Sequence, residues 1–250
     1  MTTTVKTHPV IVIDPGHSGR SIRHRNKATG LIDFDYPNDP EMYEVFGIST
    51  CVAMGLRKIG YRVVLTKKTA TSTVSLSRRA QIADAAGAAL AVSVHDDHSQ
   101  TATFQAVYSQ RGVKHNGAYH AMWRGSGATY TVFHHPQVAR RSARDARLIA
   151  QARTAAQHRP VQITEENFSG RAGLEPGNLA LVQLLSDVPW VYAEAGALTD
   201  GSTAAWMSLS DRTGYAEGLL TGIVAAVPLP AARPESRAAV RQCLIAHRSG

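Results

Sequence analysis

The sequence predicts an α/β protein with one mostly parallel, twisted sheet, helices on both faces and the active site at the C-terminal ends of the strands. Short runs rich in β-branched residues alternate along the chain with longer stretches of helical periodicity. This alternation favours parallel strands joined by right-handed helical crossovers, which place helices on both faces of the sheet. Ligands of such sheets bind beyond the carboxyl ends of the strands, so the residues that follow each strand are the first candidates for a site.

In the first half of the chain, the expected strands and helices follow one another regularly. The β-branched run Val10–Ile13 is typical of a buried strand and leads into the turn Asp14-Pro15-Gly16-His17. Residues 18–40 are polar and contain Gly, Pro and Asn, which predicts a long loop. Asp39 then suits an N-cap, with Pro40 at the first helical position. The elements expected next are a helix from Glu41 to about Lys58, a strand at Tyr61–Leu65, a helix at Ser75–Ala86 and a strand at Ala89–Val94.

The second half of the chain is less regular. Residues 99–136 are rich in Gly, His and aromatic residues and predict an insertion that contains a hairpin, with Phe104–Tyr108 as a candidate strand. Gln137–Gln157 predicts a helix whose arginines, Arg153 among them, form a solvated face, because no nucleic-acid-binding motif accompanies them. The last elements expected are a strand at Val188–Ala193 and a helix at Tyr215–Val227.

Composition limits the class of protein. The chain has 250 residues, of which 44% are hydrophobic and 18% charged, so it can build a sizeable core and is neither disordered nor collagen-like. The net charge of +8 suits polyanionic surroundings without choosing among nucleic acid, anionic lipid and acidic wall polymer. We expect no membrane span, since no apolar run approaches about 18 residues, and the N-terminus does not read as a signal peptide.

The C-terminal part of the chain predicts a domain boundary, and it contains one of the two cysteines. We expect a catalytic domain over residues 1–228 and a tail over residues 229–250, which begins at a Pro-Leu-Pro break and is predicted to be dispensable. The two cysteines, Cys51 and Cys243, exclude a disulfide framework and a thiolate-rich zinc site. We expect two unrelated thiols, with a single bridge as the alternative.

Three predicted strands end in an ionisable residue. His17, His95 and Glu194 follow strands that are expected to be parallel, so their side chains should meet at one edge of the sheet. Glu41 opens the helix that starts at the same edge. Two imidazoles and one carboxylate are a common set of protein ligands for a hydrolytic Zn²⁺, and a second carboxylate nearby can act as general base.

Structural readings compete with this hypothesis. A histidine after a buried strand is often only hydrogen-bonded. Glu41 could simply interact with the positive end of the helix dipole, since acidic residues are favoured in a first turn. Glu44 lies one turn beyond Glu41 and could replace it as ligand, although we expect it to be solvated or to lie behind the ligands. His98 could also bind metal. Asp14 is expected to brace its turn by accepting hydrogen bonds from backbone N–H groups.

Five short segments follow one another with consistent gaps and carry a family resemblance. They are Ile11–His17, Glu41 with the downstream strand 60–67, Ser75–Asp84, Ser93–Asp97 and Val191–Asp200. In this order they resemble the zinc-dependent N-acetylmuramoyl-L-alanine amidases of the Amidase_3 type, which are peptidoglycan amidases. The resemblance covers roughly residues 9–227.

The resemblance implies a zinc site and a reaction. His17, Glu41 and His95 would bind Zn²⁺, and Glu194 would be the catalytic glutamate. The cleaved amide bond would join N-acetylmuramic acid to L-Ala of the peptidoglycan stem peptide, with zinc-bound water attacking and Glu194 as general base. The partner would be peptidoglycan or a muropeptide and no nucleic acid. The enzyme would act on the cell wall, in the periplasm or outside the cell, as an autolysin or as a phage endolysin.

Two other functions remain open at this point. One is a zinc amidohydrolase that acts on a smaller amide, and the other is a metal-free regulatory or binding domain on the same fold. Asp97 stands where the family usually has Asn, which bears on how the loop after His95 is held. The long segment 99–136 makes the substrate preference less certain than the chemistry.

Overall fold

A six-stranded sheet forms the centre of the protein. The computed structural model describes residues 8–25, 32–96, 103–106, 119–121, 131–133, 136–164, 186–196, 206–229 and 236–247. The strands lie in the order β4-β1-β5-β10-β6-β9. The first four are mutually parallel, β6 is antiparallel to β10, and β9 is parallel to β6. Their bounds are β1 Val10–Pro15, β4 Arg62–Leu65, β5 Leu90–His95, β6 Thr103–Ala106, β9 Gln162–Thr164 and β10 Trp190–Glu194.

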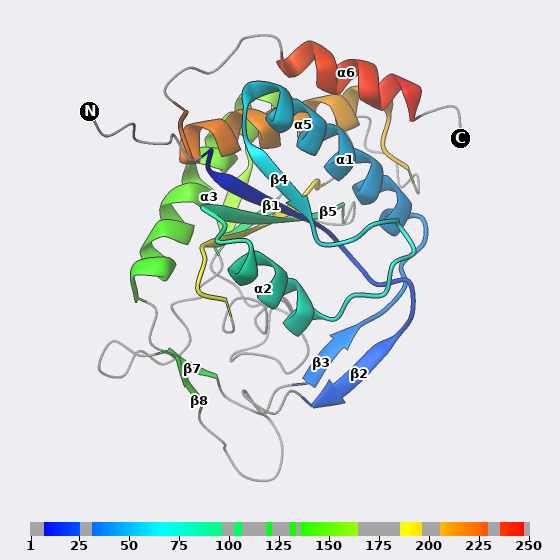
Figure 1. Cartoon of the computed structure of the whole chain (residues 1–250). Coiled ribbons are helices and arrows are strands. Elements are labelled where there is room, and N and C mark those ends of the chain that lie inside the picture. Colours follow the sequence, from blue (N-terminus) through cyan, green and yellow to red (C-terminus); the bar gives the residue numbers. More distant parts are fainter. Residues whose placement is uncertain are drawn as a thin grey trace, which may run out of the picture.

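Helices cover both faces of this sheet, as the sequence predicts. One face carries α1 (Glu41–Ile59), α3 (Pro136–Gln157) and α5 (Leu209–Ala226), and the other carries α2 (Leu76–Ala85) (Figure 1). The predicted α/β fold with a mostly parallel sheet is therefore confirmed.

Strand alternation separates an apolar face from a polar one. Ile11, Val92 and Val191 lie in the main hydrophobic cluster, together with side chains of α1, α3 and α5. Because successive side chains of a strand point to opposite faces, Asp14 and His95 face the α2 side. Glu194 pairs in register with His95 and so lies on that same polar face.

Residues 18–40 do not form the predicted loop throughout. They contain an antiparallel hairpin of β2 (Ile22–Arg25) and β3 (Ile32–Asp35). Asp33 anchors it by accepting hydrogen bonds from the backbone N–H groups of Leu76 and Ser77 at the start of α2. The sequence did not predict β3 because its inward-facing residues are aspartates instead of apolar residues. These aspartates accept hydrogen bonds from α2.

The start of α1 also differs from the prediction. Pro40 occupies the N-cap position, and no side chain caps the helix. The carbonyl of Asn38 accepts the N–H of Met42, so a backbone group satisfies part of the first turn in place of the Asp39 carboxylate.

Residues 99–136 contribute to the central sheet. Within this predicted insertion, β6 pairs with β10, and β7 (Tyr119–Ala121) pairs with β8 (Thr131–Phe133) as an antiparallel hairpin. The candidate strand at Phe104–Tyr108 corresponds to β6, which is placed at Thr103–Ala106, and residues 107 and 108 lie outside the described part of the chain.

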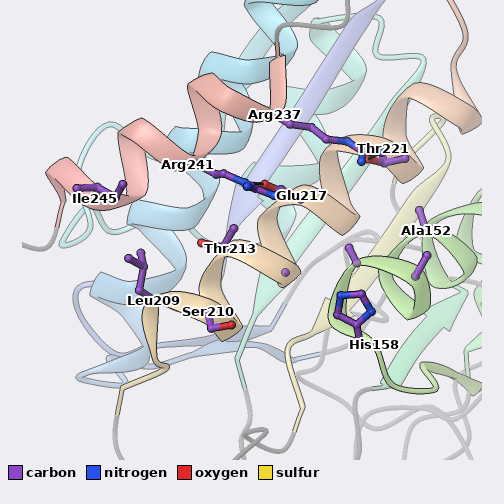
Figure 2. A pocket seen from close by; sticks show the side chains of 13 residues that line it. Ala152, His158, Leu209, Ser210, Thr213, Glu217, Thr221, Arg237, Arg241 and Ile245 are labelled. Atoms are coloured by element: carbon purple, nitrogen blue, oxygen red, sulfur yellow. Dashed lines mark hydrogen bonds and ion pairs between the residues drawn. The ribbon is translucent and has the colours of Figure 1, made fainter.

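The C-terminal segment is joined to the core. Helix α6 (Ser236–Ala246) packs on α1 and α5 and buries Val240 and Leu244 in the main hydrophobic cluster. A disulfide bond joins Cys51 of α1 to Cys243 of α6, so the expectation of two unrelated thiols is wrong. The expectation of a dispensable tail is also at odds with this packing. On the outer side of α5, Arg241 forms an ion pair with Glu217, and Arg237 donates to Thr221 (Figure 2).

A cavity lies beside this helix pair. It has a volume of about 720 Å³ and is lined by α5, α6 and the end of α3, with His158 at its rim (Figure 2). None of the predicted site residues lines it. Among the described helices, none combines the length and the apolar character needed to cross a membrane.

Candidate metal centre

The structure brings three of the predicted site residues together at the carboxyl edge of the sheet. Nε2 of His17 lies 2.9 Å from Oε2 of Glu41, and Nδ1 of His95 lies 3.0 Å from Oε1 of the same carboxylate. The two imidazole rings have centroids 5.0 Å apart. One carboxylate therefore lies between two imidazoles, one from the turn after β1 and the other from the end of β5.

These three side chains form a group that could hold a metal ion. Their ligand atoms all lie within 4.8 Å of one another. Two imidazole nitrogens and one carboxylate oxygen fit a zinc site with three protein ligands. Burial raises the pKa of Glu41, but the hydrogen bonds and charges of His17 and His95 outweigh it, so the net pKa lies well below its usual range. Glu41 is thus ionised, as a metal ligand must be.

The turn that carries His17 is held by two buried cations. His17 has a φ of 58°, a left-handed conformation that is uncommon for a residue other than glycine. Its carbonyl accepts hydrogen bonds from Nζ of Lys67 at 3.0 Å and from the guanidinium of Arg79 at 2.6 Å. Burial is the main reason that the pKa of Lys67 falls to about 8. These contacts support a backbone conformation that the turn alone would not favour.

Asp14 links the turn to the sheet through side chains, which differs from the prediction. Its carboxylate accepts hydrogen bonds from the hydroxyls of Thr66 and Ser93 and from the guanidinium of Arg79. Asp35 of the hairpin accepts from the same guanidinium at 3.0 Å. Arg79 is fully buried, and although burial opposes its charge, the two carboxylates raise its pKa. We expected backbone N–H donors to Asp14, but the guanidinium and hydroxyl groups take that place.

His95 is packed closely from both sides. A Cβ added at Gly16 would lie 2.4 Å from Cε1 of His95, so a larger residue at that position would force the ring to move. On the other side, the ring of Tyr192 lies 4.5 Å from the ring of His95, centroid to centroid. The hydroxyl of Tyr215 lies 2.9 Å from the carbonyl oxygen of His95. Burial lowers the pKa of His95, which favours the neutral imidazole that binds metals.

Glu194 is buried beside this group. It pairs in register with His95, and its side chain accepts a hydrogen bond of 2.5 Å from the hydroxyl of Tyr192. The group of potential metal ligands that holds His17 and His95 contains Glu41 and excludes Glu194. This is the arrangement that a separate general base requires, and its role remains a prediction.

Arg153 was expected on a solvated face but is fully buried. Its guanidinium donates to the carbonyls of Glu194 and Ala195 at 2.6 and 3.2 Å and lies 4.4 Å from the ring of Tyr215. Gly218 of α5 makes room for it, since a Cβ there would lie 2.7 Å from the Cα of Arg153. The periodicity of arginines along α3 gave no signal for this contact, because the turn after β10 is distant in sequence.

Two residues next to Glu41 complete the surroundings. Asn38 donates to Oε2 of Glu41 and lies 3.4 Å from Nε2 of His17. Glu44 is buried, and both its oxygens accept the N–H of Met207 at 3.0 and 3.1 Å, so it is not solvated. It anchors the segment before α5 and is not grouped with the candidate ligands. Asp97 and His98 lie outside the described residues.

The pKa of Asp96 is raised far above the usual range of a carboxylic acid. Its backbone N–H donates to Oε1 of Glu41 at 3.2 Å. Burial, followed by the negative charges of Glu41, Glu44 and Glu194, raises the pKa of Asp96 to about 11. Asp96 is therefore a neutral acid near pH 7 and adds no negative charge beside Glu41, which stays the ionised carboxylate between the two imidazoles.

Comparison with known proteins identifies relatives of the chain. The family model Amidase_3, described as N-acetylmuramoyl-L-alanine amidase, matches residues 11–225. The search of curated proteins found no match.

Solved structures share the fold at low sequence identity. Ami1, an N-acetylmuramyl-L-alanine amidase from Mycobacterium abscessus, superposes with a TM-score of 0.59 at 20% identity, over 88% of this chain and 98% of that one. Ami1 from Mycobacterium smegmatis gives a TM-score of 0.56 at 16% identity, over 87% and 96% of the two chains. AmiC2 of Nostoc punctiforme gives 0.51 at 18% identity, again over 87% and 96%.

Proposed function

The chain belongs to the Amidase_3 family of N-acetylmuramoyl-L-alanine amidases, and we propose on that premise that it is a zinc-dependent peptidoglycan amidase. The bond cleaved is the amide between the lactyl group of N-acetylmuramic acid and L-Ala of the stem peptide. The observation that carries this proposal is the convergence of His17, Glu41 and His95 beside the buried carboxylate of Glu194.

Each residue has a defined part in the proposed reaction. His17, Glu41 and His95 would hold Zn²⁺, which when bound would polarise the scissile carbonyl and lower the pKa of a water molecule beside it. Glu194 takes a proton from the attacking water and passes it to the departing amine of L-Ala. The new C–O bond forms first, and the amide C–N bond breaks once the amine has received its proton, giving a lactyl carboxylate and a free amine.

The surrounding contacts support this division of roles. Lys67 and Arg79 fix the carbonyl of His17, and Asn38 donates to Glu41, so the orientation of two candidate ligands depends on partners outside the metal. The disulfide between Cys51 and Cys243 agrees with action outside the cytoplasm, where such bonds persist.

The test combines metal content with activity. The full chain, purified and then analysed for metals, is expected to hold one zinc and to release a free L-Ala amine from purified muropeptide. Removal of zinc with a chelator should abolish this release, and added Zn²⁺ should restore it. Activity that persists without any metal would contradict the zinc mechanism. Zinc binding without cleavage of muropeptide, but with cleavage of a small acyl-L-Ala amide, would contradict the substrate.

A further inference from the structure

The β2–β3 hairpin presents an aromatic face next to the candidate metal centre. Phe34 and Tyr36 are separated by one residue and leave 39% and 45% of their surfaces exposed. Their ring centroids lie 5.7 Å apart with an interplanar angle of 36°. The ring of Tyr36 in turn lies 5.2 Å from the ring of His17. An apolar surface thus begins at a candidate metal ligand and extends outward along the hairpin.

The opposite face of the hairpin fixes this surface in place. Asp33 and Asp35 alternate with the two rings and are buried. Asp33 accepts two backbone N–H groups at the start of α2, and Asp35 accepts from the buried guanidinium of Arg79. In Figure 1 the hairpin projects beyond the carboxyl ends of the central strands, beside α2. Aromatic side chains that are held rigidly and left exposed mark a binding surface, because burying them elsewhere would be favourable.

The chemistry of this face matches a sugar ring. Arg23 pairs with Phe34 across the hairpin, and its guanidinium lies 5.9 Å from the centroid of the Phe34 ring. The face therefore offers two apolar rings, with a cationic hydrogen-bond donor over one of them. A pyranose has the complementary form, with C–H groups on its faces and hydroxyl, acetamido or carbonyl oxygens around its rim.

We propose that Phe34 and Tyr36, with Arg23 beside them, form a saccharide subsite that binds the glycan part of the substrate. This inference rests on the proposed function, because the scissile bond of that substrate joins a sugar-bearing group to a peptide. The subsite holds the sugar side of that bond. Binding energy from the sugar then positions the scissile carbonyl near His17.

The first experiment compares two substrates that share the scissile bond. One is a disaccharide muropeptide, and the other is the same peptide carrying only a lactoyl group in place of the sugar. In Phe34→Ala, the ratio of kcat/KM for the sugar-bearing substrate to that for the sugar-free one should fall about tenfold. Phe34→Tyr keeps a ring and should restore the ratio. Ile245→Ala removes an exposed apolar side chain of α6 and should leave the ratio unchanged.

The second experiment measures binding without catalysis. Peptide-free glycan oligosaccharides are titrated calorimetrically into the full chain and into Phe34→Ala, where the affinity should be about tenfold weaker. A wild-type chain that cleaves muropeptide but binds no glycan, or a variant whose ratio is unchanged, would overturn the subsite and leave the amidase proposal standing. Glycan binding that depends on Phe34 in a chain with no amidase activity would support the subsite and overturn the proposed function.

Discussion

The hydroxyl of Tyr192 donates a hydrogen bond of 2.5 Å to Oε1 of Glu194, while the Tyr192 ring lies against the imidazole of His95. The two residues are separated by one residue on β10 and share the polar face of the sheet. Tyr192 thereby connects the proposed general base to a proposed metal ligand. In the proposed reaction Tyr192 would position Glu194, because its hydroxyl contacts the carboxylate directly.

Glu194→Gln should abolish most of the activity. The amide keeps the shape of the side chain but cannot take a proton from water, so turnover should fall about 10²–10⁴-fold. Zinc content and the melting temperature should stay near the wild-type values. Glu217→Gln is the matched control, because Glu217 is also buried but pairs with Arg241 on α6. Loss of zinc from Glu194→Gln would show that Glu194 is a ligand, and retained turnover would show that it is not the base.

Tyr192→Phe should reduce turnover by a smaller factor. The ring remains against His95, but Glu194 loses one hydrogen bond that holds its carboxylate, so kcat should fall roughly tenfold while KM changes little. Tyr61→Phe serves as control, because it also removes a buried tyrosine hydroxyl. That hydroxyl donates to the carbonyl of Val227, away from the site. An equal loss of kcat in both variants would point to general destabilisation instead of positioning.

His17→Ala and His95→Ala should each lose nearly all zinc. Each removes one of the three proposed ligands, and two protein ligands are too few for a stable site. Elemental analysis of the purified variants measures this directly. His24→Ala is the comparison, since His24 is half-exposed and lies near Asp33 on the hairpin. Full zinc occupancy in either ligand variant would reject the assignment.

Gly16→Ala should displace His95 although it replaces none of the proposed ligands. The new Cβ would lie 2.4–2.6 Å from three atoms of the imidazole, so the ring has to move. We expect weaker zinc binding, measured by competition with a chelator, and a matching loss of turnover. Gly47→Ala in α1 places its Cβ more than 4 Å from any neighbour and should leave zinc affinity unchanged. Unaltered zinc affinity in Gly16→Ala would show that the site adapts to a shifted His95.

Cys243→Ser and truncation after Pro228 should both destabilise the protein. The disulfide closes a loop with a sequence separation of 192, and losing a native disulfide typically costs about 2–5 kcal/mol. Truncation also exposes the apolar surface that α6 buries on α1 and α5, so its melting temperature should be the lower of the two. Thermal unfolding of both variants under non-reducing conditions checks this order. A truncated chain as stable as the full one would restore the prediction of a dispensable tail.

The positions of the candidate site residues were largely predictable, because each residue lies next to a strand or helix that the local sequence pattern indicates. His17, His95 and Glu194 follow runs of buried β-branched residues, and parallel strands bring their ends to one edge. The register between β5 and β10 then pairs Glu194 with His95. Glu41 stands at a helix start that the following periodicity marks. None of these inferences needed a contact between distant side chains.

The features that were missed depend on such contacts. Arg153 has the spacing of a solvated helix face, yet the carbonyls after β10 and the ring of Tyr215 take it into the core. Cys51 and Cys243 are far apart in sequence, and only the packing of α6 on α1 brings them together. The hairpin strand at Ile32–Asp35 is polar because its inward side chains are bound by α2 and Arg79.

The bond between α1 and α6 makes the chain a covalent ring from Cys51 to Cys243, which contains most of the central sheet together with Glu194 and His95. A single peptide-bond cut anywhere inside this ring leaves the two pieces attached to each other. A nicked molecule would therefore keep its strands tethered at high effective concentration. Because the disulfide joins Cys51 to Cys243, every piece of residues 52–242 stays covalently attached to the rest of the chain after such a cut.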